Sequence, residues 1–273
     1  MPFAETKDSF AGDRANENVF VTTTMRAGNL SWEARKILAH EKILAVMKNP
    51  EAFLQNRALY FKSTRVVTVT KVPAASPGEP NLVLRRLNYG KALHRFRDAF
   101  RASRTRRAFR RGLMLEQCGI ATPSAFAAVD IRHFFLPRAA YLITREVSGA
   151  RTLSRFLANN PRPSRQVVWR MADMLAQLHN HNFSHRDLKP TNILLDGDSK
   201  PCLIDLDGLR KFSSLSQERI VADLARFVEG VLRHQKSLRV AQWRFLKRYC
   251  EQRKTAISVR DLAAQLEEKI RAQ

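Results

Sequence analysis

The sequence has few cysteines, no long apolar run and few acidic residues for its length. Its three cysteines, Cys118, Cys202 and Cys250, stand at wide and unrelated spacings, which excludes a disulfide framework or a cysteine-ligated metal site. No apolar run approaches the roughly 18 residues that span a bilayer, and no basic stretch followed by an apolar one opens the chain. From these absences we expect a soluble, cytoplasmic protein.

The shortage of acidic residues leaves the chain strongly basic. It has 48 Lys and Arg against 25 Asp and Glu, a formal net charge of +23. A field of this size favours polyanionic partners such as nucleic acid, an anionic membrane surface or a phosphorylated glycolipid, and charge alone does not choose among them. With 273 residues, 44% of them hydrophobic, the chain is long enough for one or two compact domains with a substantial core.

Residues 185–195, His-Arg-Asp-Leu-Lys-Pro-Thr-Asn-Ile-Leu-Leu, contain the side chains that phosphoryl transfer needs. Asp187 is placed to accept a proton from an attacking hydroxyl, and Lys189 can neutralise charge on the phosphoryl group in transfer. Asn192 and Asp205 offer the oxygen ligands that hold Mg²⁺ on nucleotide phosphates. The segment therefore predicts a base, a cation and a metal site.

The spacing of these residues supports a common site. Two short apolar runs, 193–195 and 203–204, flank a turn at residues 196–198 and predict a hairpin. Such a hairpin would return Asp205 to the side of Asn192, where both could bind the same metal ion.

These residues resemble the catalytic loop and the metal-binding Asp of the protein-kinase-like fold. The resemblance implies ATP and Mg²⁺ as cofactors and an α+β, bilobal architecture. We expect an N-terminal arm with helices over residues 1–58, a small β-rich N-lobe over 59–145 and a shortened helical C-lobe over 146–273.

The expected N-lobe departs from the pattern of that fold. No glycine-rich phosphate loop precedes the strands expected at residues 65–72 and 82–84. The second strand is followed by Arg85, where the fold would place a Lys on the nucleotide phosphates; a solvated strand-end Arg is the alternative interpretation. The helix Glu that usually pairs with this Lys has only Glu116 as a candidate. Glu146, in the hinge that the resemblance implies, is expected beside the adenine.

A basic segment follows Arg85. Residues 85–111 hold eleven Lys or Arg and one acid, and we expect two helices, the second with Ser103 as its cap and Gly119 as its stop. The apolar stripe of the first helix comprises Leu93, Phe96 and Phe100. The two helices either pack on the core with a solvated basic face or dock against anionic lipid head groups.

The other elements follow from apolar periodicity and from the resemblance. We expect a loosely held polar arm over residues 1–30, a helix over 31–47, a long core helix over 164–181, a helical core segment with Trp243, Phe245, Leu246 and Tyr249, and a closing helix over 257–270. Asp223 resembles the buried Asp that braces the catalytic loop through its backbone, and His185 resembles a bracing residue of the loop.

The spacing after Asp205 bears on the phosphate acceptor. Only 17 residues separate Asp205 from Asp223, no Ala-Pro-Glu motif follows, and 50 residues remain after Asp223. Protein kinases use a long activation loop and a large helical subdomain to grip a peptide, and neither fits here. We therefore expect a sugar, a lipid-linked sugar or another small hydroxyl compound as acceptor.

Among such kinases, the chain resembles the lipopolysaccharide core kinases of heptose or 3-deoxy-D-manno-octulosonic acid. The resemblance rests on the basic segment 84–110, on Gly-Ile-Ala-Thr-Pro at 119–123 and on Ile-Asp-Leu at 204–206. It implies an anionic glycolipid as acceptor. It also implies peripheral contact with the anionic inner face of the cytoplasmic membrane.

Three alternatives stay open. A compact atypical protein kinase would share the catalytic loop. An aminoglycoside or choline-type kinase would act on cationic acceptors, which suit a basic protein poorly. A pseudokinase or nucleic-acid-binding scaffold is favoured by Arg85 and by the missing glycine-rich loop, whereas the intact Asp187, Asn192 and Asp205 argue against it.

Overall fold

The computed structural model describes residues 22–35, 41–77, 79–89, 102–134, 136–160, 162–233, 239–253 and 257–272. The chain divides into two compact units. The first comprises Met1–Leu113 and Pro123–Glu146, and the second comprises Met114–Thr122 and Val147–Gln273.

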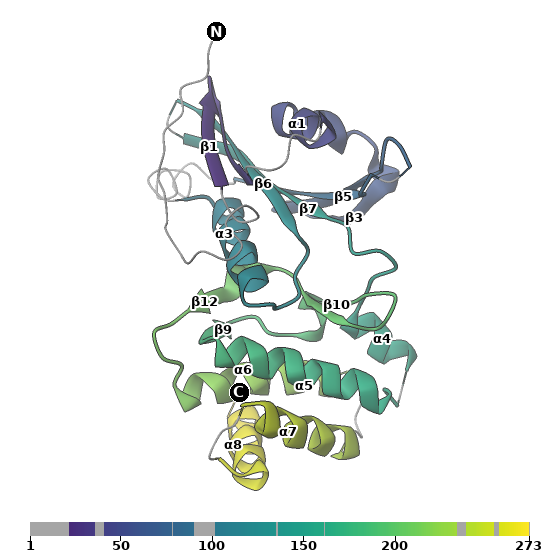
Figure 1. Cartoon of the computed structure of the whole chain (residues 1–273), viewed down its shortest axis with the longest axis vertical. Helices are drawn as coiled ribbons and strands as arrows, with labels where there is room; N and C mark the ends of the chain where they lie inside the picture. Colours follow the sequence, from purple (N-terminus) through teal and green to yellow (C-terminus); the bar gives the residue numbers. More distant parts are fainter. Residues whose placement is uncertain are drawn as a thin grey trace. The chain divides into compact units, whose positions relative to one another are not determined.

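The first unit is built on a seven-stranded antiparallel sheet with the spatial order β1-β2-β6-β7-β5-β4-β3 (Figure 1). The strands are β1 (Thr22–Ala27), β2 (Leu30–Arg35), β3 (Tyr60–Ser63), β4 (Val67–Val72), β5 (Leu82–Asn88), β6 (Ala125–His133) and β7 (Leu136–Arg145). Its helical elements are α1 (Glu41–Lys48), η1 (Pro50–Leu54), η2 (Arg57–Leu59) and α3 (Arg104–Gln117), the last of which ends in the second unit.

The two faces of this sheet differ in character. One face packs against α1 and η1 in an apolar core. The members of that core from these two elements are Ile43, Val46, Met47 and Leu54, and those from the central strands include Leu82, Leu84, Val129, Tyr141 and Ile143. The opposite face presents polar side chains of β2 and β6 to α3 through ion pairs. The sheet therefore separates an apolar layer from a charged one.

The start of the chain differs from the sequence-based expectation. Residues 22–27 are a strand where we expected a loose arm, and the helix expected over 31–47 is strand β2 followed by the short α1. The reason is a period of two: Leu30, Trp32 and Ala34 pack against the core while the residues between them turn to the other face. The expected arm over residues 1–21 and the apolar stripe 93–100 lie outside the described residues.

The second unit is mainly helical. Its helices are α4 (Leu153–Asn159), α5 (Arg165–Asn180), α6 (Gln217–Leu232), α7 (Arg239–Arg253) and α8 (Val259–Arg271). One small sheet has the order β11-β10-β8, and β12 pairs with β9 in another. These short elements are β8 (Arg151–Thr152), β9 (Phe183–His185), η3 (Pro190–Asn192), β10 (Ile193–Leu195), β11 (Pro201–Leu203), η4 (Leu206–Gly208) and β12 (Leu209–Lys211).

Local signals in the sequence explain where several helices begin and end. The hydroxyl of Ser103 accepts a hydrogen bond from the Arg106 N–H at 3.1 Å, and that of Thr152 accepts one from the Arg155 N–H at 3.2 Å. Gly119 has φ of +68° just after α3, a conformation that a glycine adopts without a steric cost. The predicted cap at Ser103 and the predicted stop at Gly119 are therefore confirmed.

The helices of the second unit pack against one another through their apolar faces. Phe245, Leu246 and Tyr249 of α7 are buried as predicted, but Trp243 is 47% exposed. Trp243 lies about 200° around the helix from Phe245, so it cannot share the same buried face. Among the described residues, no helix combines the length and the apolar character needed to cross a bilayer.

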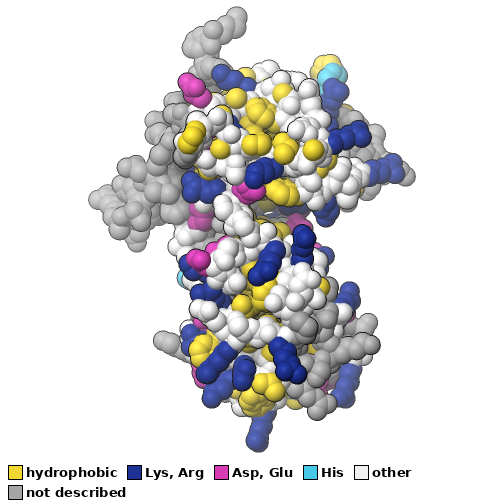
Figure 2. All heavy atoms as spheres, turned by 90° about the vertical axis from the view of Figure 1, so that its right-hand side faces the viewer, with side chains coloured by type: hydrophobic (Ala, Val, Ile, Leu, Met, Phe, Trp, Pro, Cys, Tyr) yellow, Lys and Arg dark blue, Asp and Glu magenta, His cyan; other side chains and the backbone are white. Residues whose placement is uncertain are grey.

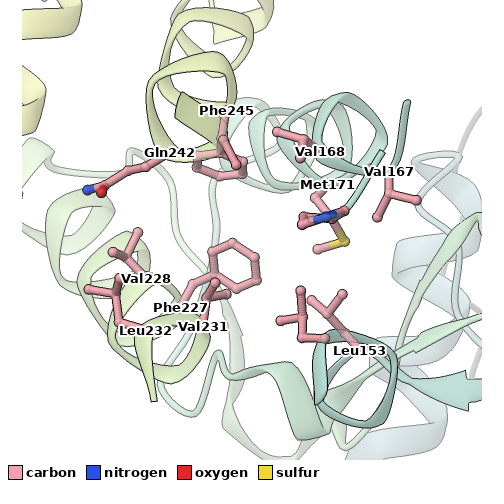
Figure 3. A pocket seen from close by; sticks show the side chains of 13 residues that line it. Leu153, Val167, Val168, Met171, Phe227, Val228, Val231, Leu232, Gln242 and Phe245 are labelled. Atoms are coloured by element: carbon pink, nitrogen blue, oxygen red, sulfur yellow. The ribbon is translucent and has the colours of Figure 1, made fainter. Parts of the chain in front are cut away.

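A small apolar cavity lies among α4, α5, α6 and α7, with about 570 Å³ of empty space (Figure 3). Phe227 and Phe245 line it with their ring centroids 5.5 Å apart, and Met171 and Leu153 face the same space. No ionisable side chain lines it among the described residues, so it is separate from the polar site described next.

Candidate active site

The catalytic loop of the candidate site directly follows strand β9. His185 at the end of β9 is fully buried and pairs with Leu209 of β12. Its Nε2 lies 3.1 Å from the carbonyl of Asp205, and its Nδ1 accepts a hydrogen bond from the Asp187 N–H at 3.3 Å. A carbonyl can only accept, so these two bonds require the neutral tautomer with its proton on Nε2. Burial lowers the pKa of His185, which agrees with a neutral, bracing role.

Asp187 is held by two neighbours on the same loop. Lys189 Nζ lies 2.8 Å from Asp187 Oδ2, and Asn192 Nδ2 donates to the same oxygen at 2.9 Å and to the Asp187 carbonyl at 2.8 Å. Partial burial by itself would raise the pKa of Asp187, but the hydrogen bonds from Lys189 and Asn192 and the Lys189 charge together lower it. Asp187 is therefore an ionised carboxylate at neutral pH with a fixed orientation.

The predicted hairpin brings Asp205 to Asn192. β10 and β11 pair antiparallel, and the Ile204 N–H donates to the Asn192 carbonyl at 2.9 Å, which sets Asp205 beside Asn192. Asp205 has φ of 57° and ψ of 59°, a left-handed conformation that is uncommon for a residue with a side chain. Such conformations cluster at functional sites because the surrounding structure must hold them.

The donor set of this pair fits Mg²⁺. Asn192 donates its amide N–H groups to Asp187, which leaves the amide oxygen as a ligand, and Asp205 supplies a carboxylate. Magnesium prefers such oxygen ligands and takes only one or two from the protein when nucleotide phosphates complete its shell. No group of three or more His, Cys, Asp or Glu side chains suited to a metal occurs in the part of the chain that the structure describes.

Two glycines, Gly208 and Gly230, allow close packing against the catalytic loop. Neither role was predicted from the sequence. A Cβ on Gly208 would lie 3.2 Å from the Asp187 backbone nitrogen, and one on Gly230 of α6 would lie 2.5 Å from Cδ of Pro190. The second distance is too short for any real contact, so a side chain there would displace the loop. Gly208, three residues after Asp205, thus packs directly against the backbone of the loop.

A buried network behind the loop includes Asp223. Its Oδ2 accepts the His185 N–H at 2.8 Å, and its Oδ1 accepts from Arg226 Nη1 at 3.0 Å. His179 Nε2 lies 3.6 Å from Asp223 Oδ2, and its Nδ1 lies 2.6 Å from the Tyr249 hydroxyl. Burial lowers the pKa of His179. Asp223 therefore braces the loop through its backbone, as predicted.

Arg85 and Glu146 belong to the first unit. Arg85 lies on β5 opposite Leu142 of β7, and strand alternation turns it away from the face that holds Leu84. The neighbouring Arg86 turns to the α1 side and pairs with Glu51 at 3.0 Å, so Arg85 stays the candidate for the nucleotide cation.

Glu146 directly follows β7 and is engaged within the first unit. Its carboxylate pairs with Lys71 Nζ at 2.9 Å, and its N–H donates to the Asn81 carbonyl at 2.9 Å. The Glu146 N–H is therefore already hydrogen-bonded to the backbone of the first unit. Of the predicted site residues, the structure brings Asp187, Lys189, Asn192 and Asp205 together within the second unit.

The charged face of the sheet holds α3 through reversed ion pairs. Arg106 Nε lies 2.7 Å from Asp130 Oδ2, and Arg110 Nε lies 2.9 and 3.1 Å from the two carboxylate oxygens of Glu33. Both acids are buried. The expected pair has an acid on the helix and a cation on a strand, whereas these pairs have the cations on the helix. The role of Glu33 was not predicted because it lies in a segment that we expected to be helical.

Comparison with known proteins shows similarity to kinases. The family model described as "Lipopolysaccharide kinase (Kdo/WaaP) family" matches residues 53–249. The "Serine/threonine-protein kinase SSN3" of Candida glabrata is 38% identical over 63 residues, 23% of this chain and 11% of the relative. The "3-deoxy-D-manno-octulosonic acid kinase" of Vibrio parahaemolyticus is 31% identical over 99 residues, 36% of this chain and 41% of the relative. The chain thus spans about a tenth and two fifths of these relatives.

Among solved structures, one described as "WaaP in complex with acyl carrier protein" superimposes with a TM-score of 0.59. The match covers 86% of this chain and 96% of the other, at 18% sequence identity. It confirms the predicted α+β, protein-kinase-like fold. The family model covers well over half of the chain, and the enzyme class predicted from the sequence, a kinase, is the class of that family. The chain belongs to the lipopolysaccharide kinase (Kdo/WaaP) family.

Proposed function

We propose that this protein is a Mg-ATP-dependent kinase that phosphorylates a sugar hydroxyl of the lipopolysaccharide inner core, on heptose or on 3-deoxy-D-manno-octulosonic acid. The observation that carries the proposal is the arrangement of Asp187, Lys189 and Asn192, with Asp205 held beside Asn192 by the hairpin. A base, a cation and two metal ligands within one unit form a complete set for transfer to an alcohol.

Asp187 is the general base of this mechanism. Its pKa is held below the usual value, so the carboxylate is ready to take the proton of an acceptor hydroxyl. Both side-chain bonds that hold it use Oδ2, and no described residue donates to Oδ1, which is the oxygen left to face the hydroxyl. Lys189 keeps the carboxylate in place and puts a positive charge beside the site of transfer.

Asn192 and Asp205 would hold Mg²⁺, which neutralises charge on the ATP phosphates when it is bound. The bond from His185 to the Asp205 carbonyl holds the backbone of Asp205 beside the loop. We assign Arg85 to the nucleotide phosphates and the chain at Glu146 to the adenine. Arg86 is a poor alternative because Glu51 neutralises it.

A small anionic acceptor is supported by the short connection after the metal site. The chain passes from β12 to α6 within residues 212–216, which leaves no room for an extended peptide-binding segment. On the face shown in Figure 2, Lys and Arg side chains are spread over the described surface of both units, and Asp and Glu are sparser. A basic surface favours an anionic glycolipid and peripheral contact with the cytoplasmic face of the membrane.

A protein acceptor is the second candidate. The matches to serine/threonine-protein kinases support it, although each spans a small part of the relative. By analogy with the complex of WaaP, we also include acyl carrier protein as a candidate partner.

The test is transfer of the γ-phosphoryl group of ATP by the purified full chain with Mg²⁺. Three reactions are compared: dephosphorylated lipopolysaccharide core, a mixture of protein substrates, and no acceptor. Our proposal predicts product only with the glycolipid. Transfer to protein in preference to glycolipid would favour the second candidate. Binding of DNA or RNA with steep salt dependence, and no transfer at all, would contradict both.

A further inference from the structure

A polar cavity lies in the second unit behind the catalytic loop. It has about 1050 Å³ of empty space, part of it open to solvent, and it is bounded by the end of β9, the start of α6 and the end of α8. Its charged lining consists of the cations Arg186, Arg219, Arg226 and Lys269 and the acids Glu218 and Asp223. The mechanism proposed above uses none of the four cations.

The charges of this cavity do not balance. Asp223 is committed, because one of its oxygens accepts the His185 N–H and the other accepts from Arg226. Asp223 and Arg226 neutralise each other, which leaves three cations against Glu218. Over the described residues of the second unit, no carboxylate lies within 4.0 Å of the charged groups of Arg186, Arg219 or Lys269. The cavity therefore carries excess positive charge.

Two of these cations, Arg219 and Lys269, line the cavity from different helices and could both bind a ligand inside it. The guanidinium of Arg219 lies over the ring of Phe212, 4.5 Å from its centroid. This stacking orients the group without neutralising it. Lys269 lies on α8, across the cavity lining from α6, so cations from separate elements converge on one space.

The first turn of α6 adds to the positive potential. Its N-cap Ser216 lines the cavity, and the hydroxyl of Ser216 does not cap the helix. The N-terminal amides of this 16-residue helix carry a partial positive charge and suit an anion. With the converging cations, they form a setting for an oxyanion.

The cavity is distinct from the catalytic side of the loop. Ser184 and Arg186 line it, whereas the side chains of His185 and Asp187 contact the Asp205 carbonyl and Lys189. Arg186 also donates its backbone N–H to the Gly208 carbonyl at 3.1 Å. A ligand that binds the Arg186 side chain would thereby steady the backbone that carries Asp187.

We propose that this cavity is a second anion site, which binds a phosphate monoester or inorganic phosphate through Arg186, Arg219 and Lys269 and stabilises the catalytic loop. The proposal goes beyond the proposed function and does not depend on it, because binding is measured without ATP or turnover. The phosphate would come either from a free anion or from a phosphorylated glycolipid.

The experiment uses calorimetric titration of the full chain with inorganic phosphate and with glucose 6-phosphate at constant ionic strength. The test variant is R219Q/K269Q, and the control is R233Q/R271Q. The control removes the same charge at the C-terminal ends of the same two helices, at exposed residues that do not line the cavity. We expect wild type and control to bind alike and the test variant to bind at least about tenfold more weakly, the loss of one or two charged hydrogen bonds.

The outcomes separate the two sources of the anion. Binding of the small phosphates, with added protection of amides 183–188 from hydrogen exchange in wild type only, supports a free anion. Binding restricted to vesicles that contain a phosphorylated glycolipid, and lost in the test variant, supports an acceptor-borne phosphate. Equal binding by all three proteins, equal losses in both double variants, or no binding of any of these ligands would overturn the proposal.

Discussion

The cations of α3 and the cations around the polar cavity show two uses of one kind of residue. In the first unit, Arg106 and Arg110 are matched by Asp130 and Glu33, acids buried under the helix. In the second unit, Arg219 and Lys269 converge on a space with too few acids to match them. The first group holds the fold together, and the second group is available to a ligand.

The difference shows that the role of a basic residue depends on whether an acidic side chain lies close enough to pair with it. The sequence concentrates its positive charge over residues 85–111, and we considered that whole segment for contact with lipid head groups. Yet two of its arginines, Arg106 and Arg110, form ion pairs with buried acids of the first unit. The cations of the cavity come from three separated parts of the sequence and form no visible cluster there.

The largest expected effect comes from breaking the first-unit pair. Arg106→Ala leaves the carboxylate of Asp130, 3% exposed, without its charged partner. Removing one partner of a buried ion pair costs about 3–5 kcal/mol, so urea unfolding should shift strongly. The control Arg104→Ala, at an exposed position of the same helix, should change stability by less than about 0.5 kcal/mol. Similar stability of both variants would refute the structural role of Arg106.

The next effect concerns the seat of the catalytic loop in the second unit. Gly230→Ala puts a methyl group where Cδ of Pro190 lies, and such overpacking costs about 1–3 kcal/mol. We expect turnover to fall by more than the loss of stability explains, because the displaced loop carries Asp187. The matched variant Gly197→Ala, which meets nothing within 4 Å, should keep its kcat. Equal kcat values for the two variants would contradict this account of Gly230.

Acidification should weaken the second unit through its buried histidines. Burial lowers the pKa of both His179 and His185 below the ordinary value of 6.5, so the unfolded chain takes up protons that the folded chain does not. The free energy of unfolding therefore falls as the pH drops below about 6.5. The melting temperature should be lower at pH 5.5 than at pH 7.5, and His179→Gln should flatten this dependence. An unchanged slope in that variant would exclude His179 as a source.

The smallest expected effect sharpens the charge balance of the cavity. Glu218→Gln removes the acid that remains after Asp223 is matched with Arg226, so phosphate should bind a few-fold more tightly. Glu267→Gln, an equal change on the exposed part of α8, is the control. Affinity that stays the same or falls in Glu218→Gln would count against an anion in the cavity.

The part of the structure that could be predicted from the sequence is the part set by local signals. The pairing of β10 with β11 followed from two apolar runs around a turn, and the start of α3 followed from Ser103. Strand β2 was mistaken for a helix because Trp32 and the apolar residues after it also fit a period of 3.6.

Features that depend on distant residues could not be predicted. Arg110 and Glu33 are 77 positions apart, and nothing local marks them as partners. In the same way, the contact of Gly230 with Pro190 arises only when α6 packs under the loop. The catalytic loop was recognised because its chemistry is contiguous in the chain, and its supports were missed because they are not.

The most direct test of the central claim is acceptor-dependent ADP formation by Asp187→Asn, compared with wild type and with Asp198→Asn. The control changes an exposed carboxylate in the turn between β10 and β11. Loss of a general base costs about 10²- to 10⁴-fold. Our account predicts a loss of that size in Asp187→Asn, with an unchanged circular dichroism spectrum, and near-wild-type turnover in Asp198→Asn. Near-wild-type turnover in Asp187→Asn would contradict the assignment of the catalytic base and, with it, the proposed mechanism.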